Sequence, residues 1–131
     1  MLSYNRFIEL KPRVLPYLMM LIKWYCAQAQ FHGIGYIDST SLRACGNKRI
    51  SRHKVLSSIA ALSKTTMGWF YGIKLHLIIN AHGEIVNLLF TRGNVDDRTP
   101  VAKMTQHLSG LLFGDKGYIK QSLFAELYAR G

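Results

Sequence analysis

Acidic residues are scarce in this sequence: seven Asp and Glu stand against 17 Lys and Arg among 131 residues, a formal net charge of +10. No acid occurs between Ser39 and Gly83. This balance favours a polyanionic partner, nucleic acid before a membrane surface, although a merely soluble basic protein would also fit.

Cysteine and long hydrophobic runs are scarce too. Cys26 and Cys45 form neither a disulfide framework nor a zinc-binding pattern, because His32 and His53 do not complete a recognised spacing. The most apolar early stretch, residues 14–22, is shorter than the roughly 20 residues that span a bilayer. Glu9 interrupts any signal-peptide pattern. We therefore expect a cytoplasmic protein of one domain without a membrane partner.

The apolar pattern predicts an α/β fold. Residues 1–30 read as a helical lead-in with a break around Pro12 and Pro16, and residues 31–38 as a short strand ending at Asp38. The basic stretch that follows is expected to form a loop with some helix. Residues 69–80 alternate with period two and 84–93 return as a second strand, which predicts a hairpin.

The remaining third of the chain predicts helix, strand and helix. Residues 94–110 read as a helix that Thr99 caps and Gly110 ends, with Pro100 in its first turn. Residues 111–115 read as a buried strand ending at Asp115, and an apolar stripe at Leu123, Phe124, Leu127 and Tyr128 marks the last helix. The crossover between the hairpin and this strand makes the sheet mixed, so Asp38 and Asp115 can converge.

Four segments in order resemble the DDE-type transposases of bacterial insertion sequences, which carry a ribonuclease-H-like catalytic domain. They are "YIDST" at 36–40, "YGIKLHLIIN" at 71–80, "TRGNVDDRTPV" at 91–101 and "FGDKGYI" at 113–119. The resemblance implies an incomplete ribonuclease-H-like mixed sheet flanked by helices, over residues 31–131. It also implies that Asp38 and Asp115 are catalytic and hold Mg²⁺, with Mn²⁺ as an alternative, for two-metal phosphoryl transfer.

The sequence departs from the family pattern at its ends. The third acid of such enzymes, a glutamate on a later helix, has no clear counterpart, since Glu126 is the sole acid after Asp115 and reads as an ordinary helix residue. The N-terminal DNA-binding region also has no room. We therefore expect a piece of a transposase gene, truncated at both ends and inactive alone, which leaves open whether it is an enzyme.

DNA is the expected partner, with full-length transposase or a second copy as further candidates and no small-molecule substrate. The basic stretch 43–54 favours contact with phosphates over a solvated face. The side chains expected to bind DNA are Arg43, Lys48, Arg49, Arg52, Lys54, Lys74 and Lys116.

Several other residues have a plain structural interpretation beside a functional one. Asp96 and Asp97 are read as favourable charges before a helix start. For Lys74, a contact with phosphate and a purely structural role are equally supported. His76 is interpreted as a polar residue on a half-exposed face. Tyr118 can touch DNA or pack its ring, and residues 69–71 can stack on bases, although core packing is the commoner role.

Two functions therefore compete. One is a partial DDE transposase domain, and the other is a non-catalytic basic remnant that binds DNA. A phosphatase-type fold with two aspartates lacks support, because neither Asp38 nor Asp115 begins a D-x-D pattern.

Overall fold

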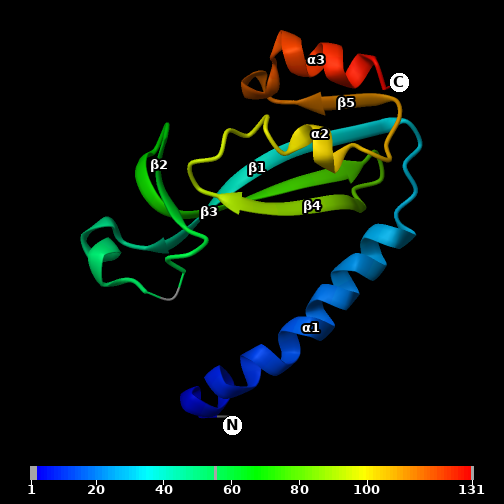
Figure 1. The fold of residues 1–131 in the computed structure, drawn as a ribbon. Helices are drawn as coiled ribbons and strands as arrows, with labels where there is room; N and C mark the ends of the chain where they lie inside the picture. Colours follow the sequence, from blue (N-terminus) through cyan, green and yellow to red (C-terminus); the bar gives the residue numbers. More distant parts are fainter. Residues whose placement is uncertain (1–2, 55, 131) are drawn as a thin grey trace.

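A mixed five-stranded sheet forms the centre of the molecule (Figure 1). The computed structural model describes residues 3–54 and 56–130. The elements are α1 (Tyr4–Gln28), β1 (Ile34–Cys45), η1 (Asn47–Arg52), β2 (Ala61–Thr65), β3 (Gly68–Asn80), β4 (Ile85–Arg92), α2 (Val101–Met104), β5 (Leu111–Gly114), η2 (Lys116–Tyr118) and α3 (Gln121–Tyr128). In the part of the chain so described, no helix is long and apolar enough to span a membrane.

Strand β3 organises the sheet. On one side it pairs antiparallel with β1; on its other side it pairs with β2 along its first residues and with β4 along the rest. Strand β5 then pairs parallel to β1. This confirms the predicted hairpin of β3 and β4 and the predicted mixed sheet.

The core lies on one face of the sheet. Ile37 of β1 and Ile78 of β3 pack against Val101 and Met104, and all four are buried. Leu123 and Leu127 of α3 complete this layer, as their predicted stripe requires, whereas Phe124 and Tyr128 stay exposed and stack on each other.

Three predicted element boundaries are wrong. Helix α1 runs unbroken for 25 residues with Pro12 and Pro16 inside it. Strand β1 continues to Cys45, since β3 pairs with it far beyond Asp38. The helix expected over residues 94–110 shrinks to the four residues of α2, whose C-cap is Thr105, and Pro100 in place of Thr99 stands at its N-cap.

The segment between β1 and β3 contains one strand that the sequence did not predict. Strand β2 pairs with the start of β3, and together with η1 it projects to one side of the main sheet (Figure 1). Helix α1 extends away from the sheet and contacts β4 near one end.

Candidate active site

The parallel pairing of β1 with β5 determines where the two predicted aspartates lie. Its last aligned pair is Ile37 with Gly114, so Asp38 and Asp115 are the next residues along both strands. Neighbouring strands are about 4.8 Å apart, which puts two carboxylates within reach of a shared cation. The structure therefore brings together two residues that are far apart in the sequence.

Two glycines allow β5 to approach β1 in this register. Gly110 has φ +132°, and a Cβ there would come within 2.3 Å of the Gly33 carbonyl oxygen. The Leu111 amide donates to the same oxygen at 2.8 Å, which aligns the start of β5 with β1. At the other end, a Cβ on Gly114 would lie 3.0 Å from Cγ2 of Ile37.

Asp38 and Asp115 are both exposed, and each has one oxygen fixed by its own backbone. Asp38 Oδ1 accepts from the Ser39 amide at 2.7 Å, and Asp115 Oδ1 accepts from the Lys116 amide at 2.6 Å. Among the described residues neither carboxylate is in an ion pair. The other oxygens are left free for a ligand.

A shallow depression holds both carboxylates. Tyr36 and Phe113 line it beside the acids, and their rings stack with centroids 5.7 Å apart. Because side chains two residues apart share a face of a strand, Tyr36 and Asp38 of β1 lie on the face opposite the core, and Phe113 of β5, which pairs with Tyr36, shares that face. Asp115 follows β5 directly and lines the same depression.

The donor set suits a hard divalent cation. Mg²⁺ is commonly held by one or two carboxylates, with water and substrate phosphates completing six oxygen ligands. Within residues 3–54 and 56–130 no group of three His, Cys, Asp or Glu side chains could hold a metal ion. Glu126 is paired with Arg130 at 2.6 Å on α3. Asp38 and Asp115 are the two carboxylates that line the depression.

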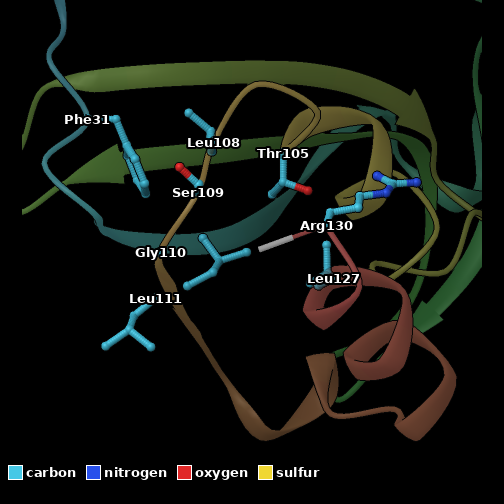
Figure 2. Close-up of a pocket in the computed structure, with 9 residues that line it drawn as sticks. Phe31, Thr105, Leu108, Ser109, Gly110, Leu111, Leu127 and Arg130 are labelled. Carbon is cyan, nitrogen blue, oxygen red and sulfur yellow. The ribbon is translucent and has the colours of Figure 1, made fainter.

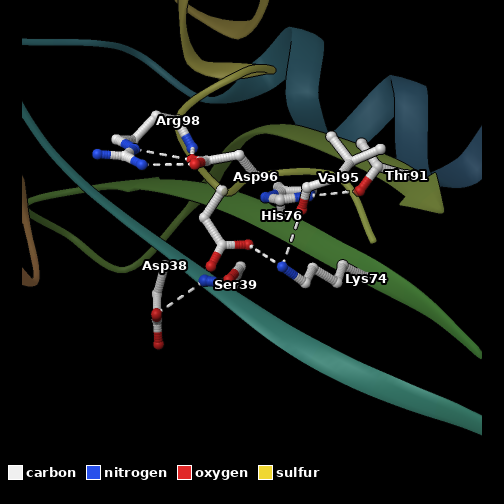
Figure 3. A network of polar contacts seen from close by, with 9 residues as sticks. Asp38, Ser39, Lys74, His76, Thr91, Val95, Asp96 and Arg98 are labelled. Atoms are coloured by element: carbon white, nitrogen blue, oxygen red, sulfur yellow. Dashed lines mark hydrogen bonds and ion pairs between the residues drawn. The ribbon is translucent and has the colours of Figure 1, made fainter. Parts of the chain in front are cut away.

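A second polar cluster lies on the core face of β3 and β4 and in the loop that follows β4 (Figure 3). The Lys74 ammonium donates to the Val95 carbonyl and to Asp97 Oδ1, each at 2.9 Å. His76 Nε2 lies 2.8 Å from the Thr91 hydroxyl. His76 is fully buried, so the expectation of a half-exposed position is wrong: β3 is an inner strand and its His76 face is covered.

Asp96 and Asp97 have different partners. Arg98 donates to Asp96 through its amide and its guanidinium, and these hydrogen bonds hold the pKa of Asp96 well below its usual range. Asp97 instead pairs with Lys74, which sequence reasoning missed. The signal was Lys74 as the one formally charged residue within Gly68–Asn80, a mostly apolar inner strand, because a cation that is largely buried needs a partner.

The basic residues between 43 and 54 are exposed and spread over the end of β1 and η1. Those residues are Arg43, Lys48, Arg49, Arg52 and Lys54, and none is in an ion pair within the described part of the chain. Lys116 is exposed directly beside Asp115. Trp69, at the start of β3, is 54% exposed, whereas Phe70 and Tyr71 are buried.

Another cavity lies away from the acids, between Phe31, the loop before β5 and the end of α3 (Figure 2). Its lining is mostly apolar, and Arg130 at its edge is already bonded to Glu126 and to the Ala102 carbonyl. It offers no reactive or charged group without a partner.

A mixed α/β sheet flanked by helices, with one aspartate on a strand and another directly after the adjacent parallel strand, is consistent with a ribonuclease-H-like domain. The family model described as "Transposase DDE domain" matches residues 28–131. The chain therefore belongs to the transposase DDE domain family, whose members act on DNA. No curated protein and no solved structure matches it significantly.

Proposed function

We propose that this chain is a DNA-binding transposase domain in which Asp38 and Asp115 hold a divalent cation, Mg²⁺ or Mn²⁺, at the phosphate to be attacked. The observation that carries the proposal is the register of β1 with β5, which sets the two acids side by side. A metal site also explains why two acids lie together on an otherwise apolar face, since a cation offsets their mutual repulsion.

The residues have separate roles in this proposal. Asp38 and Asp115 bind the cation through the oxygens that their backbone contacts leave free. Such a cation lowers the pKa of bound water and stabilises charge on phosphate oxygens. Lys116 and the basic residues of 43–54 neutralise DNA phosphates and orient the strand. Because two carboxylates hold a metal weakly, we expect little turnover by this chain alone.

Metal binding tests the assignment of the acids. We expect Asp38→Asn and Asp115→Asn each to weaken Mn²⁺ binding roughly tenfold or more, because each removes one charged oxygen donor. Electron paramagnetic resonance of free Mn²⁺ measures the affinity. Asp96→Asn, which changes a carboxylate paired with Arg98, is the matched control and should leave the affinity unchanged. Equal affinities in all four proteins would refute the metal site.

The salt dependence of DNA binding tests the basic surface. We expect the affinity for random duplex DNA to fall steeply with salt, and Arg49→Ala or Arg52→Ala each to reduce the slope of log K against log salt by about 0.9. Fluorescence anisotropy measures this. Arg6→Ala, in an arginine paired with Glu9 on α1, should leave the slope intact. An affinity that is insensitive to salt would contradict the proposal.

A non-catalytic DNA-binding protein is the second candidate. The lack of a three-residue metal cluster in the described ranges favours it. A strand-cleavage assay with Mn²⁺ separates the two, because a binding protein gives no metal-dependent product. Robust cleavage would make Glu126 the next residue to mutate.

A further inference from the structure

Lys74 is a largely buried cation with two internal partners. Its side chain is 14% exposed, and its ammonium donates to the Val95 carbonyl and to the Asp97 carboxylate. These bonds join the centre of β3 to the loop between β4 and α2. A buried charge that loses its partner is strongly destabilised, so Lys74 and Asp97 hold each other in place.

This ion pair lies beside β1 on the core face of the sheet, next to the segment that carries Asp38. In the register of β1 with β3, Ser41 is opposite Lys74 and Ser39 is opposite His76, so these residues share the core face. Asp38, between the two serines, belongs to the other face. The pair therefore supports β1 from the side that Asp38 does not occupy.

Tyr118 connects this core-face cluster to both acids. Its amide donates to the Asp115 carbonyl at 2.9 Å, and its ring lies next to Gly114, where a Cβ would be 3.2 Å from Tyr118 Cδ2. Its hydroxyl is buried beside the Ser39 side chain without a well-formed hydrogen bond. The Ser39 amide in turn donates to Asp38.

The pKa of Tyr118 reflects this buried position near three carboxylates. Burial raises the pKa of Tyr118, the nearby Ser39 side chain opposes that rise, and the negative charges of Asp97, Asp38 and Asp115 add to it. The Tyr118 hydroxyl thus lies beside the side chain of Ser39, the residue that follows Asp38.

We propose that Lys74, Asp97 and Tyr118 form a brace that positions Asp38 and Asp115 for a shared divalent cation. The inference rests on the proposed function of the two acids and adds positioning residues to it. It gives Lys74 an internal role in place of a phosphate contact, because its donors already point to Val95 and Asp97.

Terbium luminescence provides a test that does not depend on turnover. Tb³⁺ is a hard cation that binds carboxylate oxygens, and its emission lifetime reports how many waters remain on the ion. We expect Lys74→Met, Asp97→Asn and Tyr118→Phe each to weaken Tb³⁺ binding about 10- to 100-fold and to shorten the lifetime, as outer-shell changes do at metal sites. Lys74→Arg should restore much of the affinity.

Coupling and a matched control sharpen the test. The double variant Lys74→Met with Asp97→Asn should lose no more affinity than one single variant, because the two residues act as a unit. Lys64→Met, at an exposed lysine of β2, should leave Tb³⁺ affinity unchanged. Thermal unfolding without metal checks that each variant folds. If Lys74→Met does not fold, Tyr118→Phe still tests the brace.

Two outcomes would overturn the brace, and they differ from failure of the proposed function. If the lysine, Asp97 and Tyr118 variants keep wild-type affinity and lifetime while Asp38→Asn loses binding, the metal site stands and the brace is wrong. If Lys74→Met instead lowers the salt slope by about 0.9, Lys74 contacts phosphate. If the wild-type chain binds no Tb³⁺ or Mn²⁺, the proposed function fails first, and the brace fails with it.

Discussion

His76 is a buried histidine whose role is set by its surroundings. One ring nitrogen lies 2.8 Å from the Thr91 hydroxyl, and within the described chain the other, Nδ1, is buried without a hydrogen-bond partner. Burial lowers the pKa of His76 below its usual value; the Asp97 charge opposes the shift, and the Lys74 charge adds to it. The ring is therefore neutral at pH 7 in the folded protein.

The lowered pKa of His76 predicts how stability depends on pH. The unfolded chain takes up a proton near pH 6.5, before the folded protein does. The contribution of His76 to stability is thus complete above pH 6.5 and is lost as the pH falls through the folded-state pKa. Each unit of lowering corresponds to about 1.4 kcal/mol.

Urea unfolding at pH 7.5 and at pH 5 measures this loss. We expect His76→Gln, which retains a polar contact to Thr91, to remove most of the pH dependence in that window. His107→Gln changes an exposed histidine and should leave the dependence intact. A wild-type stability that is flat between the two pH values would show that His76 does not titrate in this way.

Single residues were predictable where their role is local and less so where it depends on distant contacts. Asp38 and Asp115 were identified because each follows an apolar run, and the parallel register places them together. The pairing of Lys74 with Asp97 spans 23 positions and joins a strand to a loop. The local pattern shows that Lys74 needs a partner, but it does not identify Asp97 as that partner. Asp97 was read as a helix-start charge for that reason.

At the scale of elements, α1 is the feature that local rules describe least well. Pro12 and Pro16 cannot donate to the carbonyls of Ile8 and Pro12, so the helix lacks two backbone bonds. Both prolines are exposed, as is most of the helix, and water can therefore solvate the freed carbonyls. The defects lie four positions apart, on one side of the helix, which leaves the remaining ladder continuous.

Replacing Pro16 tests this account of α1. We expect Pro16→Ala to slow amide hydrogen exchange in the middle of α1, because alanine restores a donor and is favoured in a helix interior by about 3 kcal/mol. The midpoint of global unfolding should change little, since α1 has no buried residue. Lys11→Ala is the control: lysine and alanine have similar helix propensities, so this change should alter neither the amide exchange nor the unfolding midpoint. Unaltered exchange in Pro16→Ala would contradict the account.

Elements were predicted best where burial imposes a clear period. The β3–β4 hairpin has long apolar strands and a turn at residues 80–84, so its pattern identifies it. Strand β2 was missed because its five residues, Ala61–Thr65, include only two apolar side chains and owe their conformation to pairing with β3. Helix α2 was predicted too long because capping residues mark where a helix starts and do not ensure its continuation.

At the scale of the whole molecule, the two faces of the sheet differ in cover. The core face carries α2 and α3, whereas the opposite face leaves large apolar side chains exposed, some beside the acids and some farther along the sheet. Tyr36, Phe90, Leu111 and Phe113 are 47%, 50%, 62% and 50% exposed. Apolar patches of this kind mark interaction surfaces or sites of aggregation. Sequence alternation correctly predicted two-faced strands, but it could not show which face would be covered, because apolar residues occupy both faces of β1 and β3.

The exposed face predicts self-association of the isolated chain. We expect the weight-average mass in sedimentation to rise with protein concentration and to stay raised at 1 M salt, since apolar contacts are not screened as charges are. Phe90→Ser should lower this association, because it removes an aromatic ring from the exposed face at some distance along the sheet from Asp38 and Asp115. Met67→Ser, at an 87% exposed residue of the β2–β3 turn, is the control outside this face.

A wild-type chain that stays monomeric at every concentration would show that this face remains solvated and does not bind a second copy. An association that disappears at 1 M salt would assign it to charge, and the basic stretch 43–54 would then be the surface to mutate.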